Sequence, residues 1–295
     1  MLDFRLKTFV TVWEEKSFTK AADKLCITQP AASQHIKNLE ARFGTSLFRF
    51  VGRQFFLTDA GAILYRYASS AQSEGKKVEA LLASQRGIPL RFGATRTIGE
   101  YVLPSALAYY LHNHPDAKLS MIVDNTHALL GMLLDGTIDF AFIEGIFDRK
   151  AYKTDVFLRD VFLPVCSPHD PLAQGTVELA DLLQRRLIVR EQGSGSRVIL
   201  ENALAGYNAR IEDFHRVLEL GNLEAIKGLV SEGLGIAFLY EWSVRKELAS
   251  GKIMPIHLRN FSISHDYSFV RLKNSIFEQT YQEFLDTVLQ SNVKS

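Results

Sequence analysis

The chain has 295 residues, which fits two domains better than one. Its composition, 47% hydrophobic and 23% charged, is that of a globular protein with ample core and excludes a largely disordered chain. The net charge of +1 conceals an uneven distribution, because Lys and Arg are in excess over residues 1–87 whereas Asp and Glu are in excess over 88–295. A basic module joined to a mildly acidic one is compatible with nucleic-acid binding without establishing it.

The chain shows no sign of export or membrane insertion. The first residues include Asp3, Arg5 and Lys7, so they lack the apolar run of a secretory signal. No stretch approaches the ~18 apolar residues of a membrane span. We interpret Cys26 and Cys166 as buried free thiols in a reducing compartment. A cytoplasmic protein without membrane contact is therefore expected.

Three helices are predicted at the amino terminus. Residues 4–13 carry an apolar stripe at helical spacing, and Ser17 is placed to cap a second helix. After a short break, Thr28 stands at an N-cap position, with Pro30 in the first turn, where its missing N–H costs nothing. The third helix is expected to end at Gly44.

The third helix has one apolar face and one polar face. Its inward face is formed by Ala32, Ile36, Leu39 and Phe43. Two short helices joined by a tight turn, the second of which begins with exposed polar residues, are typical of a helix-turn-helix. In that motif the second helix enters the major groove of DNA. A helical hairpin that only packs is the alternative. The residues expected to face DNA here are Thr28, Gln29, Pro30, Ser33, Gln34, His35 and Lys37.

Residues 47–58 form two aromatic-rich runs around Gly52, which predicts a small hairpin. Arg49 and Arg53 project from it. A basic hairpin after a recognition helix acts as a wing, whose guanidinium groups reach phosphates or a narrow minor groove. Two solvated surface arginines are the alternative.

These segments resemble the LysR-type transcriptional regulators. The resemblance lies in Phe-Thr-Lys-Ala-Ala-Asp-Lys-Leu at 18–25, Thr-Gln-Pro-Ala-Ala-Ser at 28–33, Ile-Lys-Asn-Leu-Glu at 36–40, and Leu-Thr-Asp-Ala-Gly at 57–61. It implies that Gln29, Pro30, Ser33, Gln34 and Arg53 contact DNA. The family often carries Arg after the helix serine, whereas this chain has Gln34 and His35, which leaves the base preference open at that position.

A long helix is predicted from Asp59 to about Gln85, capped by Thr58 and bearing an apolar seam. Such a helix pairs economically with the same helix of a second chain, although packing against its own domain is an alternative. The resemblance implies a dimerising linker helix, with a hinge at 86–89. A two-fold dimer requires an inverted-repeat operator in double-stranded DNA. A homodimer or homotetramer is expected, with RNA polymerase as a further partner.

The rest of the chain alternates strand-like and helix-like segments, which predicts parallel sheets with crossover helices in two lobes. The expected strands lie near 90–94, 119–123, 138–143, 156–166, 187–190, 215–220, 235–239 and 267–272, and the expected helices near 99–112, 126–134, 197–206, 223–231 and 276–290. The resemblance implies a periplasmic-binding-protein-like connectivity, in which the last strand and helix return to the first lobe. The fold class is thus α/β. The expected parts are a winged helix-turn-helix domain at 1–58, a linker helix and hinge at 59–87, and an effector-binding domain at 88–295, with lobe I at 88–162 and 266–295 and lobe II at 163–265.

Ligands of open parallel sheets bind at the carboxyl ends of strands, near helix amino termini that favour anions. Segments with hydroxyl groups, backbone donors and two arginines follow several predicted strands or open helices. They contain Thr95, Arg96, Thr97, Asn125, Thr126, Ser194, Gly195, Ser196, Arg197 and Asn222. We interpret them as the site of a small anionic effector, a carboxylate or an inorganic oxyanion. Helix capping beside exposed arginines is the alternative for each segment.

The sequence has no dinucleotide fingerprint, P-loop, nucleophile elbow or zinc motif, so we expect no catalytic residue, metal or cofactor. Three hypotheses follow from these observations. The preferred one is a ligand-responsive DNA-binding regulator. A small-molecule binding protein without DNA and an α/β enzyme are the alternatives, but the former has no use for residues 17–58 and the latter needs a catalytic constellation.

Overall fold

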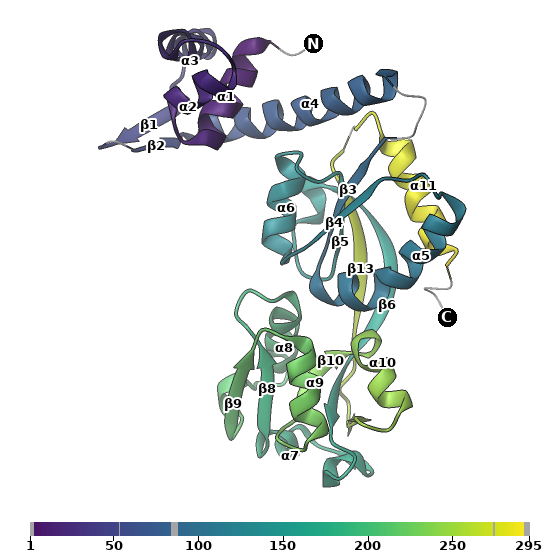
Figure 1. Ribbon diagram of the computed structural model, residues 1–295. Coiled ribbons are helices and arrows are strands. Elements are labelled where there is room, and N and C mark those ends of the chain that lie inside the picture. Colours follow the sequence, from purple (N-terminus) through teal and green to yellow (C-terminus); the bar gives the residue numbers. More distant parts are fainter. Residues whose placement is uncertain (1–2, 53, 84–87, 274, 292–295) are drawn as a thin grey trace. The chain divides into compact units, whose positions relative to one another are not determined.

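The computed structural model describes residues 3–52, 54–83, 88–273 and 275–291 (Figure 1). The chain divides into two compact units, each described by itself. The first comprises Met1–Arg91, Asp116–Ser120 and Leu130–Asp139, and the second Phe92–Pro115, Met121–Leu129 and Phe140–Ser295.

The amino-terminal elements follow the predicted order. They are α1 (Phe4–Glu15), α2 (Phe18–Lys24), α3 (Gln29–Phe43), β1 (Phe48–Val51), β2 (Gln54–Leu57) and α4 (Asp59–Ala83). The predicted caps are confirmed, because Ser17 Oγ accepts from the Lys20 N–H at 3.2 Å and Thr28 Oγ1 accepts from the Ala31 N–H at 3.3 Å. Gly44 ends α3 with a φ of +66°.

A small apolar core holds these helices and the β1–β2 hairpin together. Its buried members are Phe9, Val12, Ala21, Ile36, Leu39, Leu47 and Phe48. Two expectations are wrong at its edge. Phe43 is 47% exposed, because it lies in the last turn of α3 beside Arg42. Cys26 is exposed rather than buried, because it lies in the tight turn between α2 and α3 with a φ of +53°.

Helix α4 is capped by Thr58, whose Oγ1 accepts from the Gly61 N–H at 3.0 Å. Part of its apolar seam stays uncovered: Ile63 is 62% exposed and Leu82 is 82% exposed. The expected hinge at residues 86 and 87 lies outside the described residues, as does Gln85.

The central sheet of the carboxy-terminal part has the strand order β10-β6-β13-β5-β3-β4, with β11 also pairing with β6. Its strands are β3 (Leu90–Ala94), β4 (Leu119–Val123), β5 (Phe140–Ile143), β6 (Lys153–Cys166), β10 (Ala237–Tyr240), β11 (Met254–Pro255) and β13 (Ile263–Arg271). The expected parallel pairing holds for β3 with β5. Strand β13, however, runs antiparallel to both β5 and β6, so the sheet is mixed.

The helices of this part of the chain include two that were not predicted, α7 (Leu179–Leu183) and α10 (Glu241–Ala249). The others are α5 (Leu103–Asn113), α6 (Thr126–Leu134), α8 (Gly195–Ala205), α9 (Leu223–Ser231) and α11 (Glu278–Leu289). The segment expected as one helix over 99–112 begins with a π-helical turn, Ile98–Val102, before α5. Short 3₁₀ turns occupy Arg149–Ala151, Pro171–Ala173 and Ile211–Asp213.

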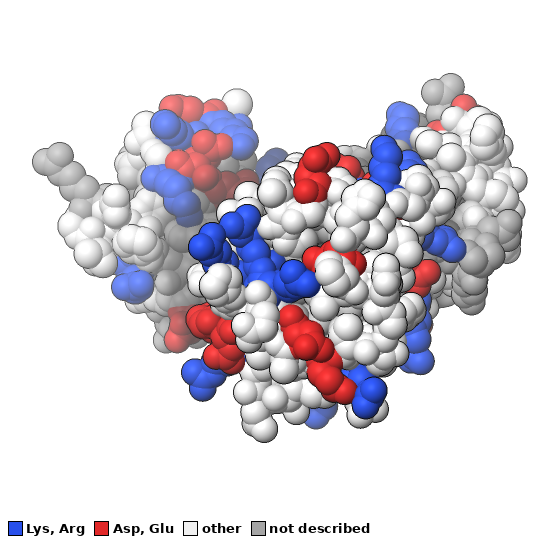
Figure 2. All heavy atoms as spheres, turned by 90° about the horizontal axis from the view of Figure 1, so that it is seen from below, with Lys and Arg blue, Asp and Glu red and all other residues white. Residues whose placement is uncertain are grey.

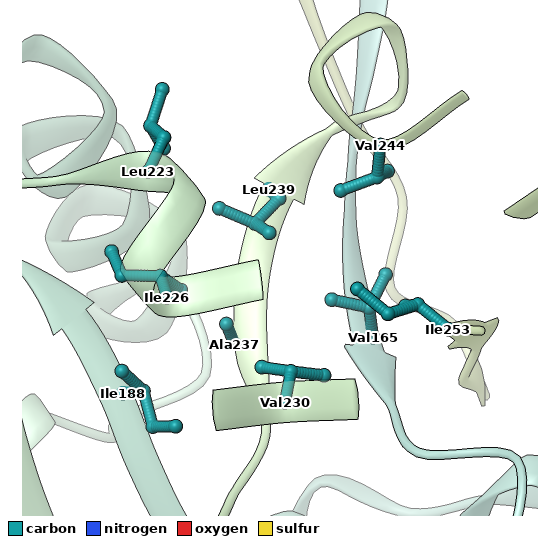
Figure 3. Close-up of a cluster of buried hydrophobic side chains, with 9 residues drawn as sticks. All are labelled: Val165, Ile188, Leu223, Ile226, Val230, Ala237, Leu239, Val244 and Ile253. Carbon is teal, nitrogen blue, oxygen red and sulfur yellow. The ribbon is translucent and has the colours of Figure 1, made fainter. Parts of the chain in front are cut away.

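The part of the chain predicted as lobe II has its own core. Strands β8 (Arg186–Arg190) and β9 (Arg216–Leu220) pair in parallel there, and β7 (Thr176–Val177) pairs with β12 (His257–Leu258). Figure 3 shows the buried cluster of Val165, Ile188, Leu223, Ile226, Val230, Ala237, Leu239, Val244 and Ile253. Each such side chain contributes ~1.5–3 kcal/mol when fully buried, so this cluster holds α9 and α10 on the strands.

The predicted lobe boundaries fall inside continuous strands. Strand β6 runs past residue 162 and β13 past residue 265, and the antiparallel ladder between them joins residues 153–162 of β6 to residues 263–271 of β13. We therefore call the β3–β4–β5 side lobe I and the β8–β9–β10 side lobe II, joined by the β6–β13 ribbon.

No described helix is long and apolar enough to cross a membrane. The face in Figure 2 shows small groups of Lys and Arg beside groups of Asp and Glu, with uncharged residues between them. This mixture of signs agrees with a net charge of +1.

Gly61 allows α4 to approach the chain at the start of the hairpin closely. A Cβ at this position would overlap the Leu47 carbonyl oxygen, which accepts the Thr58 N–H at 3.0 Å. We expect Gly61→Ala to destabilise the amino-terminal domain by about 1–3 kcal/mol through overpacking. Gly75→Ala, in the same helix with open space around it, is the matched control and should stabilise by up to ~1 kcal/mol. Urea denaturation followed by Trp13 fluorescence in a Trp242→Phe background measures both, and equal effects of the two substitutions would refute this packing constraint.

Candidate functional site

The exposed face of α3 carries polar side chains that are already paired along the helix. Gln29 Nε2 donates to Ser33 Oγ at 3.0 Å, and Gln34 Nε2 donates to Asn38 Oδ1 at 2.8 Å. Lys37 is exposed on the same helix. These contacts hold amide groups in ordered positions, where they can exchange partners for base edges.

His35 differs from the expectation that it points outward. Its Nδ1 lies 2.9 Å from Thr8 Oγ1, and its ring meets that of Phe4 edge-on at 4.8 Å. The side chain is half-buried and helps to hold α3 against α1. Thr28 and Pro30 are exposed at the start of α3, where the Thr28 side chain caps the helix.

The predicted hairpin is confirmed as β1 and β2, which pair antiparallel. Arg49 is exposed on β1, with its guanidinium 5.2 Å from the centre of the Phe56 ring. Arg53 lies outside the described residues. The α3 face and the hairpin together offer hydrogen-bonding groups and a positive charge, the two components of DNA recognition.

A partly open cavity of about 80 Å³ lies in the second unit. It sits where β3, β5 and β8 end and where α6 and α8 begin. Its lining comprises Thr95, Arg96, Asp124, Asn125, Thr126, Glu144, Arg190, Glu191, Ser194 and Gly195. Carboxyl ends of strands and amino termini of helices thus converge there, as expected for ligand sites in α/β proteins.

Most of the sequence-predicted effector residues meet in this cavity. Thr95, Arg96, Asn125, Thr126, Ser194 and Gly195 line it, and Arg96 donates to the Gly221 carbonyl oxygen across the two lobes. The others do not line it. Thr97 Oγ1 donates to Glu144 Oε1 at 3.1 Å, Ser196 Oγ lies 3.0 Å from Ser194 Oγ, and Asn222 caps α9 by accepting from the Ala225 N–H.

Arg197 is engaged by the protein itself. Its guanidinium donates to Glu201 at 2.8 Å, to Glu219 at 2.5 Å and to the Arg190 carbonyl oxygen at 3.0 Å. The side chain is buried behind the strand end rather than in the cavity. Its contacts hold α8 against β8 and β9.

Arg190 and Glu144 are lining residues that the sequence reasoning missed. Arg190 is 6% exposed and forms a bidentate pair with Glu191 at 2.7 and 2.9 Å, but its Nη1 has no hydrogen-bond partner among the described residues. Glu144 is 3% exposed. The available signal was position, because Arg190 ends one predicted strand and Glu144 follows another.

Burial dominates the electrostatics of Glu144 and raises its pKa to about 8, although the Thr97 hydrogen bond and the Arg190 charge oppose the rise. Its Oε2 has no hydrogen-bond partner among the described residues. The carboxyl is therefore mostly protonated at neutral pH.

The start of α8 completes the cavity. Ser194 makes no side-chain capping bond there, and the first N–H groups of a helix have no partner within it. A Cβ on Gly195 would lie 2.9 Å from the Glu144 carbonyl oxygen, so glycine allows the helix start to approach the end of β5. Together with Arg190 and the hydroxyl groups, this arrangement can hold a small anion.

Two family models match the chain. Residues 83–292 match the LysR substrate binding domain, and residues 4–62 match the bacterial regulatory helix-turn-helix protein, lysR family. The two matches cover both the α3 face with its hairpin and the cavity.

Curated relatives match most of the chain. The HTH-type transcriptional regulator CysL of Bacillus subtilis is 32% identical over 295 residues, which are 98% of this chain and 97% of that protein. The uncharacterized HTH-type transcriptional regulator YeiE of Escherichia coli K12 is 32% identical over 252 residues, 85% of each chain.

Solved structures share the fold. A full-length OxyR variant from Pseudomonas aeruginosa has a TM-score of 0.74 at 22% identity, covering 100% of this chain and 96% of that one. Full-length LysG from Corynebacterium glutamicum with bound effector Arg has a TM-score of 0.73 at 19% identity, covering 99% and 98%. The CcmR regulatory domain from Synechocystis in complex with 2-PG has a TM-score of 0.63 at 23% identity, covering 70% of this chain and 99% of that one.

The protonation of Glu144 should be visible in the pH dependence of stability. Because its pKa is raised on folding from 4.5 to about 8, its contribution to stability is fully present below pH 4.5 and is lost progressively as pH rises to about 8. We expect Glu144→Gln to flatten the fall in unfolding free energy between pH 5.5 and 7.5, by up to ~1.4 kcal/mol per pH unit. Denaturant unfolding at several pH values measures this slope. The control is Glu283→Gln, an exposed carboxylate of α11 outside the cavity. A slope that is identical in wild type and Glu144→Gln would show that Glu144 does not hold its proton on folding.

Proposed function

This chain belongs to the LysR family of transcriptional regulators, with a DNA-binding helix-turn-helix domain and an effector-binding domain, and we propose that a small anion held in the cavity of the second unit controls its binding to DNA. The proposal rests mainly on Arg190, which lines the cavity. Its guanidinium is buried, and its Nη1 has no hydrogen-bond acceptor among the described residues. The uncapped start of α8 adds backbone donors and a favourable dipole. A carboxylate or an inorganic oxyanion supplies the acceptors that these groups lack.

We place DNA recognition on the exposed α3 face and the hairpin. Gln29, Ser33, Gln34 and Lys37 would present donors and acceptors in the major groove, with Arg49 and Arg53 at the backbone or the minor groove. His35 is assigned a supporting role, because its contacts with Thr8 and Phe4 hold α3 in place.

The exposed apolar side chains of α4 support pairing with the same helix of a second copy. Such a dimer presents two recognition helices and requires inverted half-sites about one helical turn apart, or a multiple of that. A homodimer, or a homotetramer built from two of them, would act in the cytoplasm together with RNA polymerase.

The alternatives raised by the sequence are a binding protein without DNA and an α/β enzyme. Neither would use the helix-turn-helix that the chain carries, and the curated relatives are transcriptional regulators. We therefore assign no catalytic residue, metal or cofactor.

Effector control would work through the two lobes. Thr95 and Glu144 line the cavity from lobe I, and Arg190 and Ser194 line it from lobe II. A ligand that bonds to both sides stabilises one lobe-to-lobe arrangement and shifts the population toward it. The linker helices would carry this change to half-site spacing and DNA bending.

The base-reading role of α3 can be tested on DNA upstream of the protein's own gene. We expect Gln34→Ala to weaken binding to the footprinted operator by ~1–3 kcal/mol while leaving binding to unrelated DNA unchanged, because a side chain that reads a base edge carries sequence information. Quantitative footprinting and fluorescence anisotropy at fixed salt measure the two affinities. Gln279→Ala is the matched control, since Gln279 also pairs four residues onward, with Glu283, on a helix of the other unit. Equal losses on operator and unrelated DNA would exclude base reading by Gln34.

The anion site can be tested by arginine substitutions and isothermal titration calorimetry with sulfate, acetate and oxalate. Arg190→Ala should lower the affinity for the best-binding anion about 10- to 100-fold, because a charge-assisted hydrogen bond is lost. Arg96→Ala should also weaken binding. Arg186→Ala, at the other end of the same strand β8, is the control and should bind like wild type. Anion binding that is unaffected by both cavity substitutions would contradict the proposal.

A further inference from the structure

We propose that Glu144 joins the effector complex as a neutral carboxyl that donates a hydrogen bond to the bound anion, so that effector binding is coupled to the protonation of this residue. The inference rests on the proposed function, because it requires an anion in the cavity. It goes further by giving one residue a chemical role and by making the regulator sensitive to pH.

One of the two carboxyl oxygens of Glu144 has no hydrogen-bond partner among the described residues. Glu144 follows β5, where its own N–H donates to Thr95 Oγ1 at 3.1 Å and its Oε1 accepts from Thr97 Oγ1 at 3.1 Å. Oε2 is buried without a hydrogen-bond partner, and no Lys, Arg or His nitrogen of the described residues forms an ion pair with this carboxyl. A buried carboxylate without a counterion is costly, and a proton removes that cost.

Titratable groups on several elements surround this carboxyl. Arg190 of β8 favours its ionised form, whereas Asp160 of β6 disfavours it. The other groups near it are Tyr240 of β10, Tyr267 and His265 of β13, and the cavity residues Arg96, Asp124 and Glu191. His265 Nε2 accepts from the Gly145 N–H, and burial lowers the pKa of its ring, so it adds no positive charge at neutral pH.

Asp160, Tyr240 and Tyr267 do not change their charge around pH 8. The Asp160 carboxylate is held by hydrogen bonds from the Tyr267 hydroxyl at 2.6 Å and from the Val161 N–H at 2.7 Å. Burial raises the pKa values of both the Tyr240 and Tyr267 hydroxyls above their ordinary range, so neither loses its proton near neutrality. Glu144 is thus the cavity group whose charge changes around pH 8.

An anion and an ionised Glu144 would repel each other in this buried place. The neutral form instead offers an O–H donor on a residue that lines the cavity, as Arg190 does with its unpaired Nη1 donor. A fully deprotonated oxyanion accepts both. A ligand bearing an ammonium group would favour the ionised carboxylate, so the direction of the pH dependence separates these two kinds of ligand.

The proton balance follows from this arrangement. Below about pH 8 the carboxyl already carries its proton, and anion binding exchanges none with solvent. Well above pH 8 each binding event takes up one proton. A single linked proton with this pKa lowers affinity about 30-fold between pH 7 and pH 9.5.

The test is isothermal titration calorimetry of the full-length protein with sulfate, which does not titrate between pH 6.5 and 9.5, at constant ionic strength set with chloride. Wild type should show the 30-fold fall, and a second titration at pH 9.5 in buffers of different ionisation enthalpy should show close to one proton taken up per site. Glu144→Gln keeps an N–H donor that does not titrate, so its affinity should vary less than threefold over this range. Glu283→Gln is the carboxyl control and should retain the fall, because Glu283 is exposed on α11 outside the cavity.

Each outcome is informative. A wild-type affinity that is constant or rises with pH, or a Glu144→Gln variant with the wild-type profile, would overturn the role of Glu144 while leaving the anion site intact. If the variant does not fold, the proton uptake of wild type decides alone. Absence of binding by sulfate, acetate and oxalate at pH 6.5 would refute the anion site itself, and with it this inference.

Discussion

The antiparallel pairing of β6 with β13 connects the two lobes of the effector-binding domain. Strand β13 pairs with β5 of lobe I, and β6 pairs with β10 and β11 of lobe II. The two lobes are therefore attached to opposite edges of one two-stranded ribbon. Two-stranded ribbons twist more than wide sheets, and this one is irregular between Tyr267 and Ser268. Because Glu144 follows β5 and Arg190 ends β8, their separation is set by that ribbon, and a ligand that joins them acts directly on it.

The amino-terminal elements could be predicted closely because short-range chemistry determines their ends. Ser17, Thr28 and Thr58 each place a side-chain oxygen on a backbone N–H two or three residues into a helix, which is visible in the sequence as a hydroxyl residue before an apolar pattern. Periodicity was less reliable at the margins. Phe43 continues the apolar repeat of α3, but it lies in the last turn of the helix and stays exposed. Cys26 is an apolar residue by type, but it occupies a turn with a positive φ and its side chain is exposed.

The position of the cavity that we propose as the effector site could be predicted from the sequence, but only some of its lining residues could. Strand ends and helix starts are local features, so Thr95, Asn125, Thr126 and Gly195 could be found from pattern alone. Arg96 and Arg197 look equivalent in sequence, since both follow a strand beside hydroxyl residues. The i,i+4 pair of Arg197 with Glu201 is visible in the sequence, but only the fold shows that Glu219 of β9 takes another Arg197 donor and that, among the residues that line the cavity, the unpaired buried donor belongs to Arg190. Long-range pairing of charges is not a sequence pattern.

The pairing of Arg190 with its neighbour Glu191 determines what an effector could gain by binding. In the structure Arg190 already has Glu191 as a bidentate partner, so an anion gains only the remaining Nη1 donor unless it displaces that carboxylate. An unpaired buried donor costs about 1–3 kcal/mol, and an arriving acceptor removes that cost. The favourable energy of binding therefore comes largely from groups that the protein leaves unsatisfied, at a point where both lobes contribute. Glu144 belongs to lobe I and Arg190 to lobe II, so a ligand that bonds to both would stabilise the arrangement that brings them together, which is the differential affinity that a population shift requires.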